Sequence, residues 1–206
     1  MSGLFITFEG IDGVGKSTQV TMLQRYLESI GNTVVRTLEP GGTDLGAEIR
    51  QLLLHRKGEV APRAEALLFS ADRAHHVQTK IRPALAAGHV VISDRYFDSS
   101  VAYQGAGREL SMDEVRRINL WAVDGLLPNL TVLLDLDAAT ARSRRDSTGA
   151  EPDRLEREKI EYFEATRAAF LQLAQNEPER FFVVSAAASP DIMHAQIRAR
   201  VNQLLG

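Results

Sequence analysis

The sequence predicts an α/β fold built around a buried parallel sheet. Short runs of β-branched or aromatic residues alternate with longer runs of helical periodicity along the whole chain, a pattern typical of repeated strand–helix–strand units. Hydrophobic residues make up 44% of the 206 residues and charged residues 25%, close to the averages of globular proteins. The chain therefore has the apolar content for a core and the length of one compact domain.

Five segments have the composition of strands. They are residues 4–9, 33–38, 89–94, 130–135 and 181–185. Each is short and rich in β-branched or aromatic residues, as expected for strands that are buried in a parallel sheet. Because parallel neighbours need crossover connections, helices are expected between them.

The first two predicted helices follow the first two strands. One ends before Gly31, which stands where a left-handed C-cap belongs. Its apolar residues recur at helical spacing and are Val20, Leu23, Leu27 and Ile30. The other follows residues 41–42, and its side chains expected to face the core are Leu45, Ile49, Leu52 and Leu53.

The longest helix is predicted over residues 62–87. Pro62 suits the first turn of a helix, and Gly88 stops the pattern. A further helix is expected to begin near residue 112, because Ser111 and Glu114 have the spacing of a capping box.

Two more helices close the chain and are separated from the preceding pattern by a polar segment. They are predicted over residues 155–176 and 190–205, the second with Ser189 as its N-cap. Residues 146–153 read Asp-Ser-Thr-Gly-Ala-Glu-Pro-Asp, with no apolar side chain larger than Ala. Such a segment predicts a mobile loop or lid.

The charge balance and the missing cysteines exclude several classes of protein. With 24 basic and 27 acidic residues the net charge is −3, so a general nucleic-acid or anionic-membrane binder is disfavoured. Disulfides, thiolate zinc sites and cysteine nucleophiles are excluded because the chain has no Cys. No apolar run approaches the roughly 20 residues of a membrane span, and we expect a cytoplasmic protein.

The strongest motif is Gly-Ile-Asp-Gly-Val-Gly-Lys-Ser at residues 10–17, which fits the phosphate-binding pattern G-x-x-x-x-G-K-S/T. It follows a predicted strand and opens a predicted helix, so backbone N–H groups and the helix dipole can bind a β-phosphate. Lys16 can bridge the β- and γ-phosphates, and the Ser17 hydroxyl can ligate Mg²⁺. The alternative, a glycine-rich turn that matches by chance, is disfavoured by this context.

A second group of charged residues follows the third predicted strand. Asp94 and Arg95 stand at the carboxyl end of the strand, where open α/β sheets bind ligands. Asp94 could hold Mg²⁺ through water, and Arg95 could bind a phosphate through two hydrogen bonds. The alternative is structural, with Asp94 capping the next segment and Arg95 paired to it.

Phe69 and Arg73 are four residues apart and share one face of the longest helix. An aromatic plane beside a guanidinium suits a nucleotide base that stacks on the ring and is hydrogen-bonded at its edge. On spacing alone, a Phe that only packs in the core is the more common case.

Arginines flank the lid-like segment. Arg142, Arg144 and Arg145 precede it, and Arg154 follows it. They could close on phosphates and supply positive charge to the transferring group. The alternative is a solvated basic helix end, because helix C-termini favour Arg.

Taken together, the motifs resemble bacterial-type thymidylate kinases over most of the chain. They are FEGIDGVGKS at residues 8–17, EPGGT at 39–43, DRYFDSS at 94–100 and AYQG at 102–105. The resemblance implies one nucleoside monophosphate kinase domain over residues 1–206. The implied P-loop NTPase fold has a five-stranded parallel sheet, helices on both faces and a short lid at about 142–154. It further implies a homodimer that transfers the γ-phosphoryl group of Mg·ATP to thymidine monophosphate, for dTTP biosynthesis.

The same resemblance implies the residues of the site. ATP would bind at Gly10, Asp12, Gly13, Gly15, Lys16, Ser17, Thr18 and Arg144. Thymidine monophosphate would bind at Glu39, Arg50, Phe69, Arg73, Arg95, Ser99, Ser100, Tyr103 and Gln104. Phe69 would stack on thymine, with Arg73 and Gln104 at its edge. Magnesium would lie near Asp12, Ser17 and Asp94, and the catalytic residues would be Lys16, Asp94, Arg95, Arg144 and Arg145.

Two other functions stay open on the sequence. A deoxynucleoside kinase would need a carboxylate base such as Glu39 for its hydroxyl acceptor, whereas a phosphate acceptor is already anionic at neutral pH, since its second pKa is near 6. A nucleotide-dependent switch or binding module is disfavoured, because no Asp-x-x-Gly stands at the end of the third strand and Asn-Lys-x-Asp is missing altogether.

Overall fold

The computed structural model describes residues 3–106, 110–149 and 151–205. Within these ranges the strands form one five-stranded sheet in the order β2-β3-β1-β4-β5, and every neighbouring pair is parallel. The strands are β1 (Leu4–Glu9), β2 (Val34–Leu38), β3 (Val90–Asp94), β4 (Leu130–Asp135) and β5 (Phe181–Ser185). The predicted α/β fold and its parallel sheet are confirmed, and each predicted strand lies within one residue of the observed bounds.

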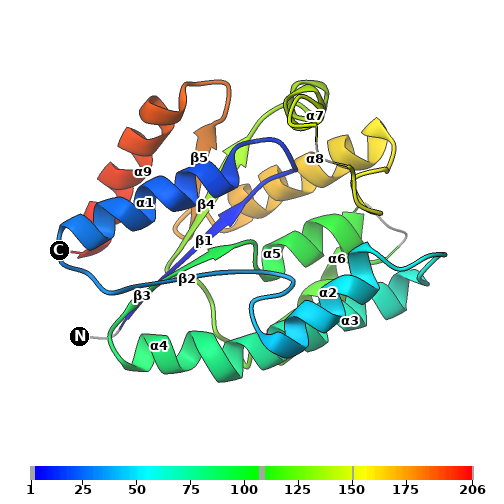
Figure 1. Ribbon diagram of the computed structural model, residues 1–206, viewed down its shortest axis with the longest axis horizontal. Helices are drawn as coiled ribbons and strands as arrows, with labels where there is room; N and C mark the ends of the chain where they lie inside the picture. The colour runs from blue at the N-terminus through cyan, green and yellow to red at the C-terminus, as the bar shows by residue number, and fades with distance from the viewer. Residues whose placement is uncertain (1–2, 107–109, 150, 206) are drawn as a thin grey trace.

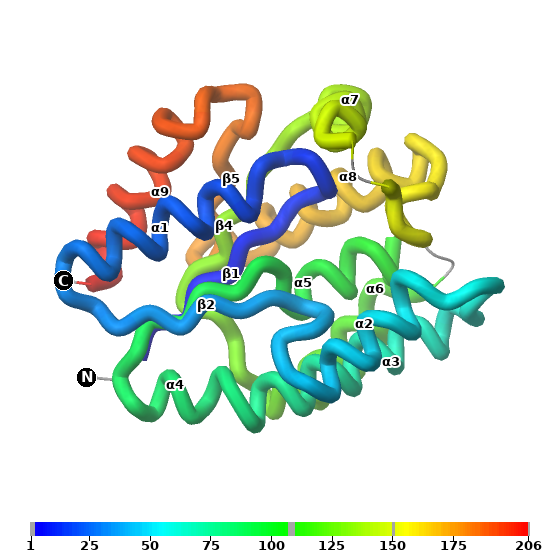
Figure 2. Tube along the Cα trace, viewed as in Figure 1, coloured from blue at the N-terminus to red at the C-terminus, as the bar shows by residue number. Residues whose placement is uncertain are grey.

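Helices cover both faces of the sheet (Figures 1 and 2). They are α1 (Lys16–Ser29), α2 (Asp44–Leu54), α3 (Pro62–His76), α4 (Arg82–Ala86), α5 (Phe97–Ser100), α6 (Met112–Ala122), α7 (Ala138–Asp146), α8 (Ile160–Asn176) and α9 (Pro190–Leu205). Helices α1 and α9 contact each other and lie on one face, whereas α4 and α8 contact the other face. This arrangement follows from right-handed crossovers between parallel strands.

The register of the sheet brings the ends of β1 and β3 together. Phe8 of β1 pairs with Asp94 of β3, so the segments that follow the two strands leave the sheet at the same edge. After β1 the chain crosses to β2, on one side of β1 in the sheet, and after β3 it crosses to β4, on the other side of β1. This reversal between neighbouring strands is the point at which open α/β sheets bind ligands.

The longest predicted helix is interrupted. Residues 77–81 form a π-helical turn, η1 (Val77–Ile81), between α3 and α4. A second π-helical turn, η2 (Val101–Ala106), follows α5 and carries two of the predicted site residues. Such turns occur often at functional sites, and the apolar periodicity of a sequence does not reveal them.

The predicted start of the helix over 155–176 is wrong, because α8 begins at Ile160. The Asp153 carboxylate accepts hydrogen bonds from the backbone N–H groups of Leu155 and Glu156 at 2.8 and 2.9 Å. This local turn satisfies the backbone groups that would otherwise begin a helix.

Helix α2 does not present all the apolar residues to the core that its spacing predicts. Ile49 and Leu53 are buried, but Leu45 and Leu52 are exposed. The reason is that α2 packs on α3 beside the sheet rather than over it, so only one narrow face is covered. Ile30, predicted on the inner face of α1, is also exposed, since α1 ends before it.

Of the two predicted N-caps, Ser189 acts as expected, because its Oγ accepts from the N–H of Ile192 at 3.4 Å in α9. Ser111 stands at the N-cap of α6, but the predicted capping box is not formed, because the Ser111 side chain makes no capping hydrogen bond. In the part of the chain that the structure describes, none of the helices combines the length and the apolarity needed to cross a bilayer.

Candidate active site

The phosphate-binding loop lies at the carboxyl edge of the sheet, between β1 and α1. Gly10 and Gly13 both have positive φ, at 132° and 89°, which side-chain-bearing residues rarely adopt. A Cβ atom on Gly13 would lie 2.0 Å from the carbonyl oxygen of Ala141, and one on Gly10 would lie 2.5 Å from that of Leu134. The two glycines therefore let the loop pack directly against β4 and α7.

Lys16 lies beneath this loop. Its ammonium donates to the carbonyl oxygens of Gly10 and Ile11 at 3.0 and 2.9 Å and is 3.8 Å from the Asp12 carboxylate. Burial, with the charge of Arg95 added, lowers the pKa of Lys16 below its ordinary value. A cation held in this way is positioned for the phosphates of a nucleotide that binds over the loop.

Ser17 and Asp94 form the group best suited to hold a divalent cation. Ser17 Oγ donates to Asp94 Oδ2 at 2.9 Å, across the gap between α1 and β3. A hydroxyl and a carboxylate are oxygen ligands of the kind that Mg²⁺ prefers, and Mg²⁺ takes its remaining ligands from water and phosphate. The residues present thus fit the predicted ion.

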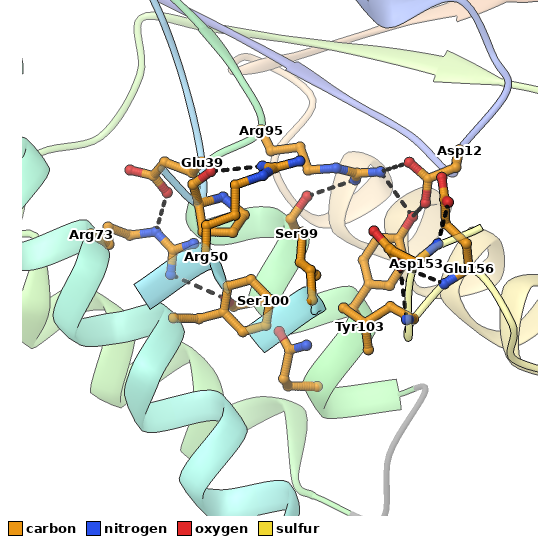
Figure 3. A pocket seen from close by; sticks show the side chains of 15 residues that line it. Asp12, Glu39, Arg50, Arg73, Arg95, Ser99, Ser100, Tyr103, Asp153 and Glu156 are labelled. Carbon is orange, nitrogen blue, oxygen red and sulfur yellow. Dashed lines mark hydrogen bonds and ion pairs between the residues drawn. The ribbon is translucent and has the colours of Figure 1, made fainter. Parts of the chain in front are cut away.

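Arg95 lies between the loop and the rest of the site (Figure 3). Its backbone is in the left-handed region, with φ 72°, which is unusual outside glycine and is commonly found at functional sites. The guanidinium donates to Asp12 Oδ1 at 2.6 Å and to Ser99 Oγ at 3.0 Å, and it lies 4.9 Å above the Tyr103 ring. Arg95 therefore reaches both the P-loop and the neighbouring helical segment.

The electrostatics of Asp12 follow from this pairing. Burial alone would raise the pKa of Asp12, but the charges of Arg95 and Lys16 outweigh burial and lower it to about 2. Asp12 is thus a carboxylate at any physiological pH. In this arrangement its nearest cation is Arg95, which contacts one of its two carboxylate oxygens at 2.6 Å.

Two cavities meet at this point. One is lined by Asp12, Gly13, Gly15, Lys16, Ser17, Thr18, Leu38, Glu39, Arg50, Asp94, Arg95, Arg144, Arg145, Thr148 and Glu156. The other is lined by Asp12, Glu39, Pro40, Arg50, Leu54, Phe69, Arg73, Arg95, Ser99, Ser100, Tyr103, Gln104, Asp153, Leu155 and Glu156. We name the first the P-loop cavity and the second the acceptor cavity. They share Asp12, Glu39, Arg50, Arg95 and Glu156.

The structure brings the predicted site residues together as two groups. Every residue predicted for the acceptor nucleotide lines the acceptor cavity. Those predicted for ATP line the P-loop cavity, except Gly10, whose carbonyl oxygen accepts from Lys16 and Arg95. The sequence did not indicate Pro40, Leu54, Asp153, Leu155 or Glu156 as residues that line the acceptor cavity. Only the position of residues 153–156, at the end of the predicted lid and just after it, could have suggested any of them.

Arg73 is fixed by four neighbours. Its Nε donates to Glu39 Oε2 at 2.6 Å, and its terminal nitrogens donate to Ser100 Oγ, to the Tyr96 carbonyl oxygen and to Asn119 Oδ1. A guanidinium has five N–H donors, so one is left for a ligand in the acceptor cavity. Asn119, on α6, is a supporting residue that carries no recognisable signal in the sequence.

Glu39 is held from two sides. Arg73 pairs with one carboxylate oxygen, and His76 Nδ1 lies 2.8 Å from the other. Burial acts to raise the pKa of Glu39, but Arg73 and His76 together lower it below its ordinary value. A general base needs a pKa near the working pH, so this carboxylate is poorly suited to deprotonate a hydroxyl acceptor. The alternative that required Glu39 as base is therefore not favoured.

Phe69 is part of an apolar cluster and also lines the acceptor cavity. It packs with Ile49, Leu53 and Leu54 in a small apolar cluster between α2 and α3, and it also lines the acceptor cavity. Its predicted structural and ligand-facing roles are compatible, because one ring face can pack while the other stays open.

The lid arginines separate into three environments. Arg144 and Arg145 line the P-loop cavity, where they donate to the carbonyl oxygens of Ala186 and Glu156, each at 2.8 Å. Arg142 instead lies over the Phe163 ring, 5.6 Å from its centroid. Arg154 crosses to the acceptor side and donates to the Leu53 carbonyl oxygen at 2.8 Å.

We expect Asp72→Asn to stabilise the protein in a pH-dependent way. Asp72 is fully buried, and among the described residues its Oδ2 has no hydrogen-bond partner. Burial, followed by the charge of Glu39, raises the pKa of Asp72 from 3.8 to about 6. A raised pKa in the folded state means that the parent protein loses stability as the pH rises from about 4 to about 6. The Asn variant avoids this loss, which is at most about 3 kcal/mol.

Urea unfolding of both proteins below pH 4 and near pH 7.5 measures the effect. The free energy of unfolding of Asp72→Asn, relative to the parent, should increase with pH. Asp191 is an exposed carboxylate on α9, so Asp191→Asn should show little such increase. A difference between Asp72→Asn and the parent that stays constant over this range would contradict the expectation.

A P-loop and a second, arginine-lined cavity that share their central residues define a P-loop kinase, an enzyme that moves a phosphoryl group between two bound molecules. The family model for thymidylate kinase matches residues 8–197. The chain belongs to the thymidylate kinase family, and it is a phosphotransferase, as the sequence predicted.

Relatives and a solved structure agree with this assignment over nearly the whole length. The thymidylate kinase of Leifsonia xyli subsp. xyli is 61% identical over 200 residues, which cover 97% of this chain and 95% of that protein. The thymidylate kinase of Clavibacter sepedonicus is 60% identical over 205 residues, 100% of this chain and 97% of that one. The crystal structure of thymidylate kinase from Ehrlichia chaffeensis has a TM-score of 0.81 at 31% identity and covers 98% of this chain and 99% of its own.

Proposed function

We propose that this chain transfers the γ-phosphoryl group of Mg·ATP to the phosphate of thymidine monophosphate and so forms thymidine diphosphate for dTTP biosynthesis. The observation that carries the proposal is the junction of the two cavities. Arg95, Arg50 and Asp12 line both of them, so a donor phosphate over the P-loop and an acceptor phosphate beyond it would meet between the same side chains.

The donor side is built for a triphosphate. Backbone N–H groups of the P-loop and the N-terminus of α1 bind the β-phosphate, and Lys16 neutralises the β- and γ-phosphates. Ser17 and Asp94 would hold Mg²⁺, as their 2.9 Å contact supports. The ion, when bound, would offset the negative charge that develops on the phosphate groups.

The acceptor side orients a pyrimidine nucleotide. Phe69 stacks on thymine, Arg73 and Gln104 hydrogen-bond its edge, and Tyr103 lies against the deoxyribose. Arg50, which donates to the Pro40 carbonyl oxygen at 2.8 Å, and Arg95 bind the acceptor phosphate. This phosphate is already an anionic nucleophile near neutral pH, so the site needs no general base.

Catalysis then consists of positioning and charge neutralisation. Two polyanions repel each other, and the shared arginines offset that repulsion while they hold the reacting oxygens in line. Residues at about 142–154 act as the lid of a single kinase domain over 1–206 and exclude water, the competing acceptor. Because both substrates are nucleotides of intracellular metabolism, we assign the enzyme to the cytoplasm.

A coupled assay of ADP formation with Mg·ATP tests the function. We expect rapid turnover with thymidine monophosphate and little with thymidine or with purine monophosphates. Phosphorylation of thymidine instead would favour the deoxynucleoside kinase. ATP binding without any turnover that depends on added monophosphate would favour the binding module, and either result would overturn the proposal.

We expect Arg144→Ala and Arg145→Ala each to lower kcat by about 10- to 1,000-fold, because both line the P-loop cavity and would stabilise charge on the transferring group. Arg142→Ala is the matched control from the same helix, since Arg142 lies over Phe163 outside the residues that line this cavity. Steady-state kinetics of the three variants measure the effects. Equal losses in all three would contradict a specific role for Arg144 and Arg145.

An apolar groove supports the predicted homodimer. It lies on α3 and α6 and is lined by Leu67, which is 56% exposed, by Trp121, which is 85% exposed, and by Ile118. Contiguous exposed apolar surface of this kind favours association. We expect sedimentation velocity to give the mass of two chains for the parent and of one chain for Trp121→Asp. A parent that sediments as one chain would contradict this proposal.

A further inference from the structure

Glu65 is a buried carboxylate that the mechanism above does not use. It lies in the first turn of α3 and is fully inaccessible to solvent. Its two oxygens have different partners. Oε1 accepts from Nε2 of Gln104 in η2 at 3.2 Å, and Oε2 accepts from the guanidinium of Arg154, at the end of the lid. Glu65 therefore joins a residue of the acceptor cavity to the lid.

The contact with Glu65 determines which way the Gln104 amide faces. An ionised carboxylate only accepts hydrogen bonds, so it must face the NH₂ group of the amide and not the carbonyl oxygen. The carbonyl oxygen of Gln104 is then at the opposite end of the amide. Gln104 is almost completely buried and lines the acceptor cavity, so water cannot easily substitute for a mismatched partner.

An amide fixed in this orientation offers an acceptor to a base. Thymine and uracil carry N3–H, a donor, whereas the N3 of cytosine is an acceptor. The carbonyl oxygen, at the end of the amide away from Glu65, is the group left to pair with N3–H, and it would be repelled by the lone pair of the cytosine nitrogen. Sites that hydrogen-bond a substrate through buried groups discriminate strongly, because the wrong substrate leaves those groups unpaired.

Arg154 connects this orientation to the lid. It binds Glu65 through its side chain, and its backbone N–H donates to the carbonyl oxygen of Leu54 at 3.3 Å. The neighbouring Leu155 packs against the apolar cluster of α2 and α3. The contact between Arg154 and Glu65 therefore requires the segment after the lid to lie against α2.

We propose that Glu65 is a positioning residue that orients the Gln104 amide and so selects pyrimidines with N3–H, and that Arg154 holds the Glu65 carboxylate in place for this role. The inference rests on the proposed function, since it concerns the base of the same acceptor. The substitution Glu65→Gln tests it. A Gln side chain can donate as well as accept, so the Gln104 amide becomes free to turn round.

The measurement is kcat/KM for thymidine monophosphate and for deoxycytidine monophosphate. In Glu65→Gln we expect the preference for thymidine monophosphate to fall by about tenfold or more. Most of the loss should be in KM, because the phosphate-binding residues are untouched. Glu59→Gln, an exposed carboxylate in the loop before α3, is the matched control and should keep the preference of the parent.

Arg154→Ala removes the other partner of the contact with Glu65, and the Arg154 side chain is partly exposed. We expect a smaller loss of preference in Arg154→Ala than in Glu65→Gln. The double variant should lose no more than Glu65→Gln alone, because both changes act through one interaction. Should Glu65→Gln fail to fold by thermal denaturation, the preference of Arg154→Ala decides.

A preference within twofold of the parent in Glu65→Gln, or in Arg154→Ala where only that variant folds, would overturn the inference. So would additive losses in the double variant. These failures differ from a failure of the proposed function, in which the parent itself would form no ADP with thymidine monophosphate.

Discussion

Replacing Arg95 by alanine is expected to lower kcat by about a thousandfold while leaving the Kd for ATP nearly unchanged. Arg95 lies where the two cavities meet, so its charge acts on the acceptor phosphate and on the transferring group rather than on bound ATP alone. Steady-state kinetics give kcat and KM for both substrates, and calorimetric titration of the variant gives the affinity for ATP.

Two further variants sharpen this prediction. Arg95→Lys keeps the positive charge but loses the planar fork that contacts Asp12 and Ser99 together, so we expect only partial recovery of turnover. Arg25→Ala removes an exposed arginine of α1 and should have no effect. Turnover of Arg95→Ala within threefold of the parent would show that the transfer does not depend on this guanidinium.

The second large effect is expected for Lys16→Met, in which kcat should also fall by about a thousandfold. The Met side chain has about the length of the Lys stem but carries no charge for the phosphates. Stability should not fall with activity. Burial lowers the pKa of Lys16, which means that the folded protein disfavours the charged form of this side chain. We therefore expect a thermal midpoint equal to or above that of the parent.

Activity and thermal denaturation must be measured on the same preparations for this test. Lys57→Met, an exposed lysine in the loop between α2 and α3, controls for the loss of one positive charge. A Lys16→Met protein that is both inactive and clearly less stable would contradict the separation of function from stability. It would assign Lys16 a structural role through its bonds to Gly10 and Ile11.

The elements that the sequence predicted well are those that leave a local pattern. The strands and the P-loop are contiguous segments whose composition and spacing reflect their own backbone conformation. The errors arose where partners from elsewhere in the chain decide. Leu45 and Leu52 have helical spacing, yet they are exposed because α2 lies on α3 beside the sheet. The late start of α8 has a local cause instead, because the Asp153 carboxylate accepts from the backbone N–H groups of Leu155 and Glu156.

The sequence by itself therefore determined the parallel α/β fold, the phosphate-binding loop and the set of side chains from which the site is built. Only the tertiary structure decided how these side chains are paired. Arg95 lies 83 residues from Asp12, and Arg154 lies 89 residues from Glu65. The physical reason is that helix packing around one edge of the sheet brings these partners together, and such contacts between distant residues leave no periodic signal in the chain.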